Sequence, residues 1–221
     1  PYTHSGVLSS ALAMNKIVSK QMFRQAGIPV PEGGVCDLRE LPAQQIQFSP
    51  FVIKPVDEGS SLGVQIVRNK SQAVFDGMLW DGCKTVMVEE YIPGRELTVA
   101  VLGERSLEVL EMKPRDGFYD YESKYTPGRT NYLIPAPLSS KIRSEILNYA
   151  QLAHETMGCN GVTRADFRYD ESRGSEGIKL LEINTQPGLT PTSLVPQIAA
   201  YAGITFNALV EWMLGNAKCS G

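Results

Sequence analysis

The sequence has few of the side chains from which metal centres and disulfide frameworks are usually built. It contains 4 cysteines and 2 histidines among 221 residues, and no two cysteines form a CxxC pair. Structural zinc sites use closely spaced ligand pairs, and disulfide-stabilised secreted domains are shorter and richer in cysteine. We therefore expect reduced thiols and no structural zinc, as in a cytoplasmic protein.

Long apolar runs and an excess of positive charge are missing as well. No apolar run approaches the ~18–20 residues that a membrane-spanning helix needs, and the formal net charge is -3. Proteins that bind nucleic acid mainly through bulk charge are basic, and the chain has no basic stripe with interleaved aromatic residues. We expect neither nucleic acid nor a membrane among its partners.

The chain has enough apolar sequence for a core, 43% of its residues, and that sequence alternates in short segments. Helical spacing predicts a leading helix, a central helix and two closing helices, at 6–26, 139–157, 193–202 and 205–214. Strand-like alternation is found at 51–55, 63–67, 85–92, 96–102, 106–112, 162–169 and 178–183. The strands form hairpins and do not alternate regularly with helices, which predicts an α+β fold of two lobes.

Polar side chains occupy every second position of the two last predicted strands. Arg164 and Asp166 share one face of their strand, and Glu182 and Asn184 share one face of the next. If these strands pair as a hairpin, two carboxylates and an amide converge, and such hard oxygen ligands suit Mg²⁺. Alternating polar residues on an exposed strand are the ordinary alternative. The apolar neighbours of Glu182 favour a site, because carboxylates beside a core need a cation.

A second polar segment runs from Lys54 to Gly63. A lysine at a strand end, followed by glycine and the two serines Ser60 and Ser61, offers a cation, hydroxyls and backbone N–H groups to a phosphate. The segment is neither a Walker loop nor a GxGxxG turn, and by itself it also fits an ordinary surface loop.

Two further segments allow a functional and a structural interpretation. The strand end at Glu89, with Glu96 beyond it, has groups to recognise a purine edge and ribose hydroxyls, or it is a charged hairpin edge that deters aggregation. Gly188 permits close backbone approach, and Ser193 lies near a helix start that favours a carboxylate or an oxyanion. The alternative for this segment is simple capping by Thr192 or Ser193.

These four segments, in this order and with these separations, resemble the ATP-grasp superfamily and, within it, the D-alanine–D-alanine ligases. The similar stretches are Pro1-Tyr2-Thr3 with Ser5-Gly6, Glu58–Gly63, Phe118–Tyr125 and Glu182–Gly188. The resemblance covers essentially the whole chain. It implies two α+β lobes whose antiparallel sheets enclose ATP. Residues 1–92 would form the central lobe with the leading helix and serine loop, and residues 93–221 the C-terminal lobe with the closing loop and metal site.

The resemblance implies a reaction and a role for each matching residue. ATP would phosphorylate the carboxylate of one D-alanine, and the amine of a second D-alanine would attack that acylphosphate, which yields a dipeptide for peptidoglycan precursors. Two Mg²⁺ (or Mn²⁺) ions would be bound by Asp166, Glu182 and Asn184. The nucleotide and its phosphates would be bound by Lys16, Lys54, Ser61, Glu89, Tyr91, Ile92, Glu96 and Lys124. Arg164 and the backbone N–H of Gly188 would form the oxyanion hole. Ser193 and Leu194 would bind the carboxylate of the second D-alanine. Ser60 and Tyr125 would link the serine loop to the closing loop by a hydrogen bond.

The resemblance also implies a front domain that this sequence does not contain. In these ligases an additional α/β domain supplies a glutamate for the amine of the first D-alanine. We therefore expect the chain alone to retain the nucleotide and metal site and to have little ligase activity. Members are often homodimers, so the resemblance allows a homodimer, although the sequence alone does not decide the oligomeric state. The alternatives are another ATP-grasp carboxylate–amine ligase and a non-catalytic nucleotide-binding module.

Overall fold

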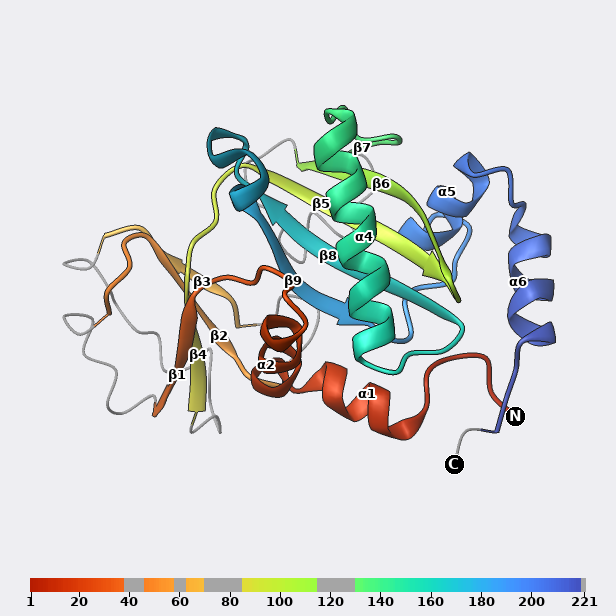
Figure 1. Ribbon diagram of the computed structural model, residues 1–221, viewed down its shortest axis with the longest axis horizontal. Helices are drawn as coiled ribbons and strands as arrows, with labels where there is room; N and C mark the ends of the chain where they lie inside the picture. The colour runs from red at the N-terminus through yellow and green to blue at the C-terminus, as the bar shows by residue number, and fades with distance from the viewer. Residues whose placement is uncertain (38–45, 58–62, 70–84, 115–129, 220–221) are drawn as a thin grey trace.

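The computed structural model describes all residues except 38–45, 58–62, 70–84, 115–129 and 220–221. Within the described residues, the chain forms two antiparallel sheets with helices grouped around them, which confirms the predicted α+β class (Figure 1). The smaller sheet has the strand order β1-β4-β2-β3 and the larger has the order β7-β6-β5-β8-β9. No single helix in the described part is long and apolar enough to span a bilayer, and the helix pair Leu194–Tyr201 and Phe206–Gly215, which together reach that length, is bent by 105°.

The four-stranded sheet packs its apolar side chains into a small core of its own. Its strands are β1 (Gly33–Asp37), β2 (Phe51–Pro55), β3 (Gln65–Val67) and β4 (Thr85–Glu90). Phe51 and Ile53 of the predicted strand alternate inward and meet Val86 and Val88 of β4 in that core. Strand β1 was not predicted, because its Gly33-Gly34 start has low strand propensity.

The five-stranded sheet contains both of the predicted strand pairs. Its strands are β5 (Arg95–Leu102), β6 (Arg105–Pro114), β7 (Thr130–Leu133), β8 (Val162–Tyr169) and β9 (Ile178–Asn184), with the 3₁₀ segment η5 (Glu171–Gly177) between the last two. Strands β5 and β6 form the expected hairpin, and β8 pairs antiparallel with β9 as expected. The short edge strand β7 was not predicted.

One face of this sheet is covered along its length by the long helix α4 (Ser140–Thr156) (Figure 1). Ser139 caps the helix, since its hydroxyl accepts a hydrogen bond from the N–H of Ile142 at 3.4 Å. Ile146 and Ala150 of the helix pack with Val99 and Phe167 of the sheet in the largest apolar core. This core fixes the strands β5, β8 and β9 relative to one another.

Among the described residues, helices cover the opposite face of the sheet at one end. Helices α5 (Leu194–Tyr201) and α6 (Phe206–Gly215) pack on Ala100, Leu102 and Val162. Further along the same face, where the register pairs Thr98 with Asp166 and Glu96 with Arg168, the side chains are polar. The alternation of strands β5 and β8 thus produces an apolar end under the helices and a charged end beyond them.

The leading segment folds as two helices, so the prediction of one helix over 6–26 is wrong. Helix α1 (Val7–Met14) and helix α2 (Lys16–Gln25) are separated by Asn15, whose backbone is extended. The Asn15 side chain accepts hydrogen bonds from the N–H groups of Ile17 and Val18, both at 3.1 Å, and so caps α2. The break places Lys16 at the start of α2, where its N–H donates to the carbonyl of Val56 at 3.2 Å.

The linker that joins the two sheets consists of the residues Tyr91–Gly94, between β4 and β5. The predicted lobe boundary between residues 92 and 93 falls inside this linker. Phe23, Ile28 and Val30, which precede the four-stranded sheet, pack into the core beneath the five-stranded sheet. The division into lobes 1–92 and 93–221 stays a prediction.

Gly94 fixes the path of the linker, and its replacement should be costly. Its φ is +89°, and a Cβ there would lie 2.3 Å from the carbonyl oxygen of Tyr169. We expect Gly94→Ala to lower the free energy of unfolding by about 3 kcal/mol, because the left-handed backbone and the backbone clash both contribute. Gly203→Ala is the matched control, with φ +82° and nothing within 4 Å, and it should cost only about 1 kcal/mol. Equal losses in urea denaturation would contradict the close approach.

Candidate active site

The structure brings the predicted metal residues together at the charged end of the five-stranded sheet. Asp166 of β8 lies directly opposite Glu182 of β9, and Arg164 lies opposite Asn184. Residues directly opposite on antiparallel strands share a face and lie about 4.5–5.5 Å apart at Cβ. The pairing that the sequence left conditional is therefore present.

The carboxylate of Asp166 is the centre of this group. Arg164 donates to both of its oxygens, from Nε to Oδ1 at 2.9 Å and from Nη2 to Oδ2 at 2.8 Å. The Thr98 hydroxyl donates to Oδ1 at 2.6 Å, and the Asn184 amide donates to Oδ2 at 2.9 Å. Charge-assisted bonds of this kind fix the orientation of a carboxylate. Thr98 was missed in the sequence, where the one available signal is a hydroxyl inside the apolar run of β5.

The donor set fits a hard divalent cation. The residues Asp166, Glu182 and Asn184 offer two carboxylates and an amide, and Mg²⁺ is usually bound by a few such groups together with phosphate oxygens. Among the described residues, no three His, Cys, Asp or Glu side chains are grouped as a metal site. A cation here would take the amide oxygen of Asn184 as a third protein ligand and complete its coordination with further oxygen ligands.

A second group of charges lies in the four-stranded sheet and α2. The Glu89 carboxylate forms an ion pair with Lys54, Nζ to Oε2 at 2.7 Å, and its other oxygen contacts the ammonium of Lys20. Lys20 and Glu89 are buried, with 1% and 3% of their surfaces exposed. Lys20 was missed in the sequence, although it lies four residues after Lys16 and hence on the same side of the helix.

Burial and mutual charge shift the proton affinities within this group. Burial lowers the pKa of Lys20 to about 7, with Lys54 acting in the same direction and Glu89 against it. Burial acts to raise the pKa of Glu89, but the ammonium groups of Lys54 and Lys20 outweigh it, so the pKa of Glu89 is lowered. Glu89 therefore stays ionised as the counter-charge of two buried lysines.

Lys16 connects the two charged groups. Burial lowers the pKa of Lys16, Glu182 in the five-stranded sheet acts to raise it, and Lys54 in the four-stranded sheet acts to lower it. Its side chain is thus within electrostatic reach of both sheets. A polyphosphate with bound cations would complement both groups, because one offers lysines and the other carboxylates.

Two residues after β9 also lie side by side: Gly188, predicted for the oxyanion hole, and Ser193, predicted to bind the second substrate. A Cβ on Gly188 would lie 2.9 Å from the hydroxyl of Ser193, so only glycine fits there without displacing that side chain. Ser193 is the residue before α5, yet its side chain makes no capping hydrogen bond. Its hydroxyl instead accepts from the N–H of Thr190 at 3.0 Å. The capping interpretation of Ser193 is therefore wrong for the side chain, and Leu194 begins the helix.

The predicted adenine and ribose residues lie on or beside the linker. The N–H of Tyr91 donates to the carbonyl of Pro50 at 3.2 Å, and the carbonyl of Ile92 accepts from Arg168 at 3.1 Å. Glu96 lines a cavity of about 470 Å³ at the same end of the sheet. The remaining predicted site residues lie outside the described residues: Ser60, Ser61, Lys124 and Tyr125.

Comparison with known proteins identifies the family. The chain matches the family model described as "D-ala D-ala ligase C-terminus" over residues 22–215. It is 52% identical to the D-alanine–D-alanine ligase of Chelativorans sp., and the match covers 99% of this chain and 73% of the relative. The chain belongs to the D-alanine–D-alanine ligase family. The ligase of Paramagnetospirillum magneticum is 49% identical, with 99% and 72% covered.

Solved structures of the ligase family have the same fold. The D-alanine–D-alanine ligase of Bacillus anthracis complexed with ATP has a TM-score of 0.80 at 25% identity, with 98% of this chain and 69% of that chain covered. The VanG D-Ala:D-Ser ligase of Enterococcus faecalis has a TM-score of 0.82 at 29% identity, with 97% and 64% covered. Both likenesses agree with the predicted ATP-grasp architecture.

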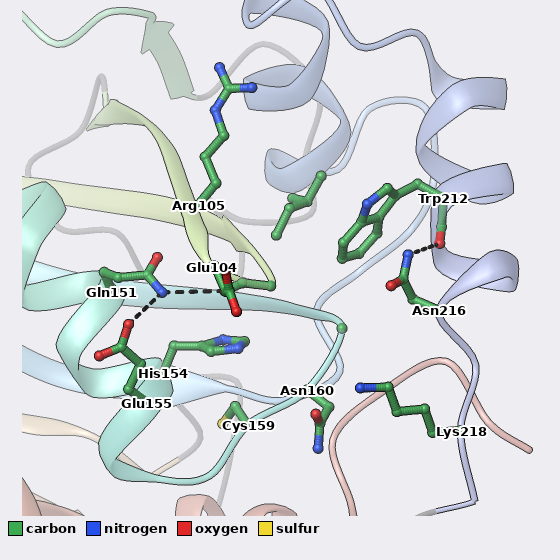
Figure 2. A pocket seen from close by; sticks show the side chains of 13 residues that line it. Glu104, Arg105, Gln151, His154, Glu155, Cys159, Asn160, Trp212, Asn216 and Lys218 are labelled. Carbon is green, nitrogen blue, oxygen red and sulfur yellow. Dashed lines mark hydrogen bonds between the residues drawn. The ribbon is translucent and has the colours of Figure 1, made fainter.

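A larger cavity, of about 570 Å³, lies away from these residues (Figure 2). It is formed by the β5–β6 turn, the end of α4, and α6, and none of the predicted site residues is among its lining residues. Its lining mixes Glu104 and Glu155 with Arg105 and Lys218. Such balanced charge does not favour the binding of a nucleoside triphosphate, whereas the lysines beside Glu89 offer positive charge for its phosphates.

Breaking the buried Glu89 pair should destabilise this ligase-family fold. Glu89→Gln leaves Lys20 and Lys54 without their counter-charge, and we expect a loss of about 3–5 kcal/mol in unfolding free energy. Adding Lys20→Met to that variant should recover a large part of the loss, because one buried cation is removed. Urea denaturation of the single and double variants measures both values. A double variant less stable than Glu89→Gln would contradict the pairing.

Proposed function

We propose that the ligase to which this chain contributes its nucleotide and metal site joins two D-alanines into D-alanyl-D-alanine with ATP, through an acylphosphate. The observation that supports it best is the placement of Asp166, Glu182 and Asn184 on one sheet face, together with the buried lysines Lys16 and Lys54. The named activity of relatives with about half of their residues identical supports the same reaction. Its product serves peptidoglycan precursor synthesis.

The lysines prepare the site for phosphoryl transfer. A carboxylate is a poor electrophile, and transfer of the γ-phosphoryl group to its oxygen provides a good leaving group. The barrier to that transfer is lowered when positive charge is already in place around the phosphates. Lys16 and Lys54, both largely buried, would provide this charge without first shedding much water.

Asp166, Glu182 and Asn184 would bind Mg²⁺ beside the phosphates. When bound, the cation neutralises charge on the transferring phosphoryl group. Arg164 donates two hydrogen bonds to the carboxylate of Asp166, so its guanidinium is oriented before any substrate binds. Together with the N–H of Gly188, it would donate hydrogen bonds to the oxyanion that forms at the acyl carbon.

The second D-alanine would bind next to Gly188. The Ser193 hydroxyl and the start of α5 at Leu194 would bind its carboxylate, because a helix N-terminus favours an anion. Its amine attacks the acyl carbon, so that a C–N bond forms, the C–O bond to phosphate breaks, and the amine loses a proton. Inorganic phosphate leaves with the electron pair of the broken bond.

D-serine is the second candidate for the attacking amine, because the similar structure from Enterococcus faecalis is a D-Ala:D-Ser ligase. Eight relatives of higher identity, 45% to 52%, are named D-alanine–D-alanine ligases. An equimolar mixture of the two amino acids, analysed by mass spectrometry, separates the candidates. We expect D-alanyl-D-alanine as the main product.

The acylphosphate can be tested by isotope transfer. D-alanine labelled with ¹⁸O in its carboxylate should pass one ¹⁸O atom to inorganic phosphate for each dipeptide formed. The reason is that the C–O bond of the acylphosphate breaks, so the bridging oxygen, which came from the carboxylate, stays on phosphorus. Mass spectrometry of the phosphate gives the count. Unlabelled phosphate would mean that water attacks ATP, and it would refute the proposed route.

Removal of one proposed metal ligand should abolish the effect of Mg²⁺ on nucleotide binding. We expect Glu182→Gln to weaken Mg²⁺-dependent ADP binding at least tenfold in isothermal titration calorimetry, because an amide replaces an anionic oxygen ligand. Glu176→Gln, on the exposed segment η5, is the matched control and should bind as the wild type does. Unchanged affinity in Glu182→Gln would instead favour a nucleotide-binding module without a metal site.

A further inference from the structure

One side chain of β8 makes contacts along most of the linker between the two sheets. The Nε of Arg168 donates to the carbonyl of Ile92 at 3.1 Å, and its Nη2 donates to the carbonyl of Gly94 at 3.0 Å. The guanidinium carbon lies 5.9 Å from the ring centroid of Tyr91. A single planar group thus contacts three of the four linker residues.

The third nitrogen of the same guanidinium reaches the predicted ribose ligand. Its Nη1 lies 3.3 Å from Oε2 of Glu96, and both side chains are largely shielded, 14% and 16% exposed. Arg168 and Glu96 are also directly opposite in the β5–β8 register. The carboxylate is therefore oriented both by its strand and by the guanidinium.

The position of Arg168 along β8 connects the two ends of the nucleotide site. Arg168 lies two residues after Asp166 and on the same face, which places the two side chains about 6.6–6.8 Å apart along the strand. Asp166 belongs to the group proposed to bind the cation, and Arg168 contacts the segment proposed to bind adenine and ribose. One rigid strand therefore sets the separation between the two ends.

We propose that Arg168 is a positioning residue for the nucleotide, which orients the Glu96 carboxylate towards the ribose and fixes the linker beside the adenine. This inference rests on the proposed ATP-dependent function. It requires the geometry of arginine, because lysine has one compact ammonium and cannot bond Ile92, Gly94 and Glu96 in the same arrangement. A charge effect alone would be satisfied by lysine.

The test compares ligands with and without the nucleoside. In Arg168→Met and Arg168→Lys, we expect the dissociation constant of Mg·ADP to rise about tenfold, as for loss of a charge-assisted hydrogen bond. The dissociation constant of Mg·tripolyphosphate, which has neither base nor ribose, should stay at the wild-type value. Isothermal titration calorimetry gives both constants. Arg173→Met, which replaces an exposed arginine 4.0 Å from Glu90, is the matched control.

A double-mutant cycle then tests whether Arg168 acts through the ribose ligand. In a Glu96→Gln background, Arg168→Met should weaken ADP binding by clearly less than tenfold, because the carboxylate that it orients is gone. Full additivity of the two variants would overturn the proposed route.

The outcomes separate the inference from the function on which it rests. A wild-type protein that binds no Mg·ADP would refute the proposed function itself. Wild-type affinity for ADP in Arg168→Met, or an equal loss for ADP and tripolyphosphate, would overturn the positioning role and leave the function intact. Full rescue by Arg168→Lys would show that charge alone is needed, which also contradicts the proposal.

Discussion

The proposed nucleotide site depends on a sheet face that, among the described residues, helices cover at one end. In strands β5 and β8 every second side chain points to this face, and the residues change from apolar to charged along it. The apolar end is buried under α5 and α6, and α4 packs on the opposite face of the same sheet. Because the strands are continuous, the core under the helices fixes the positions of the charged side chains beyond them.

The fixed strands hold the carboxylate of Asp166 among several hydrogen-bond donors. Four hydrogen bonds from Thr98, Arg164 and Asn184 converge on its two oxygens. A carboxylate fixed in this way needs little reorganisation to bind a cation or to orient the guanidinium that donates to it. In the four-stranded sheet, the Glu89 carboxylate orients Lys54 through an ion pair, and the break at Asn15 places Lys16 at the start of α2.

The sequence predicted the parts of the fold that depend on local alternation. Pairing of β8 with β9 was expected because the two alternating segments are separated by a short polar turn, and the antiparallel register then brings their polar residues to one face. The break at Asn15 was missed because the apolar spacing continues across it, while the capping that separates the helices depends on one side chain. The short edge strand β7 has too few residues for a clear pattern.

The site was predictable to the extent that residues resemble those of known ligases. The alternation of polar residues already grouped Arg164, Asp166, Glu182 and Asn184, the resemblance gave them roles, and the structure brings them together. Thr98, Lys20 and Arg168 were not assigned, because their roles arise from contacts with residues that are between 68 and 76 positions away in the chain. Side-chain identity on one strand does not show which backbone carbonyl or carboxylate lies opposite.

The most direct measurement is a crystal structure of this chain with Mn²⁺ and a non-hydrolysable ATP analogue. The account predicts anomalous density for Mn²⁺ between Asp166, Glu182 and Asn184, with the adenine at the linker and the ribose at Glu96. A nucleotide bound instead in the cavity beside Trp212 (Figure 2), or density for Mn²⁺ elsewhere in the chain, would contradict it.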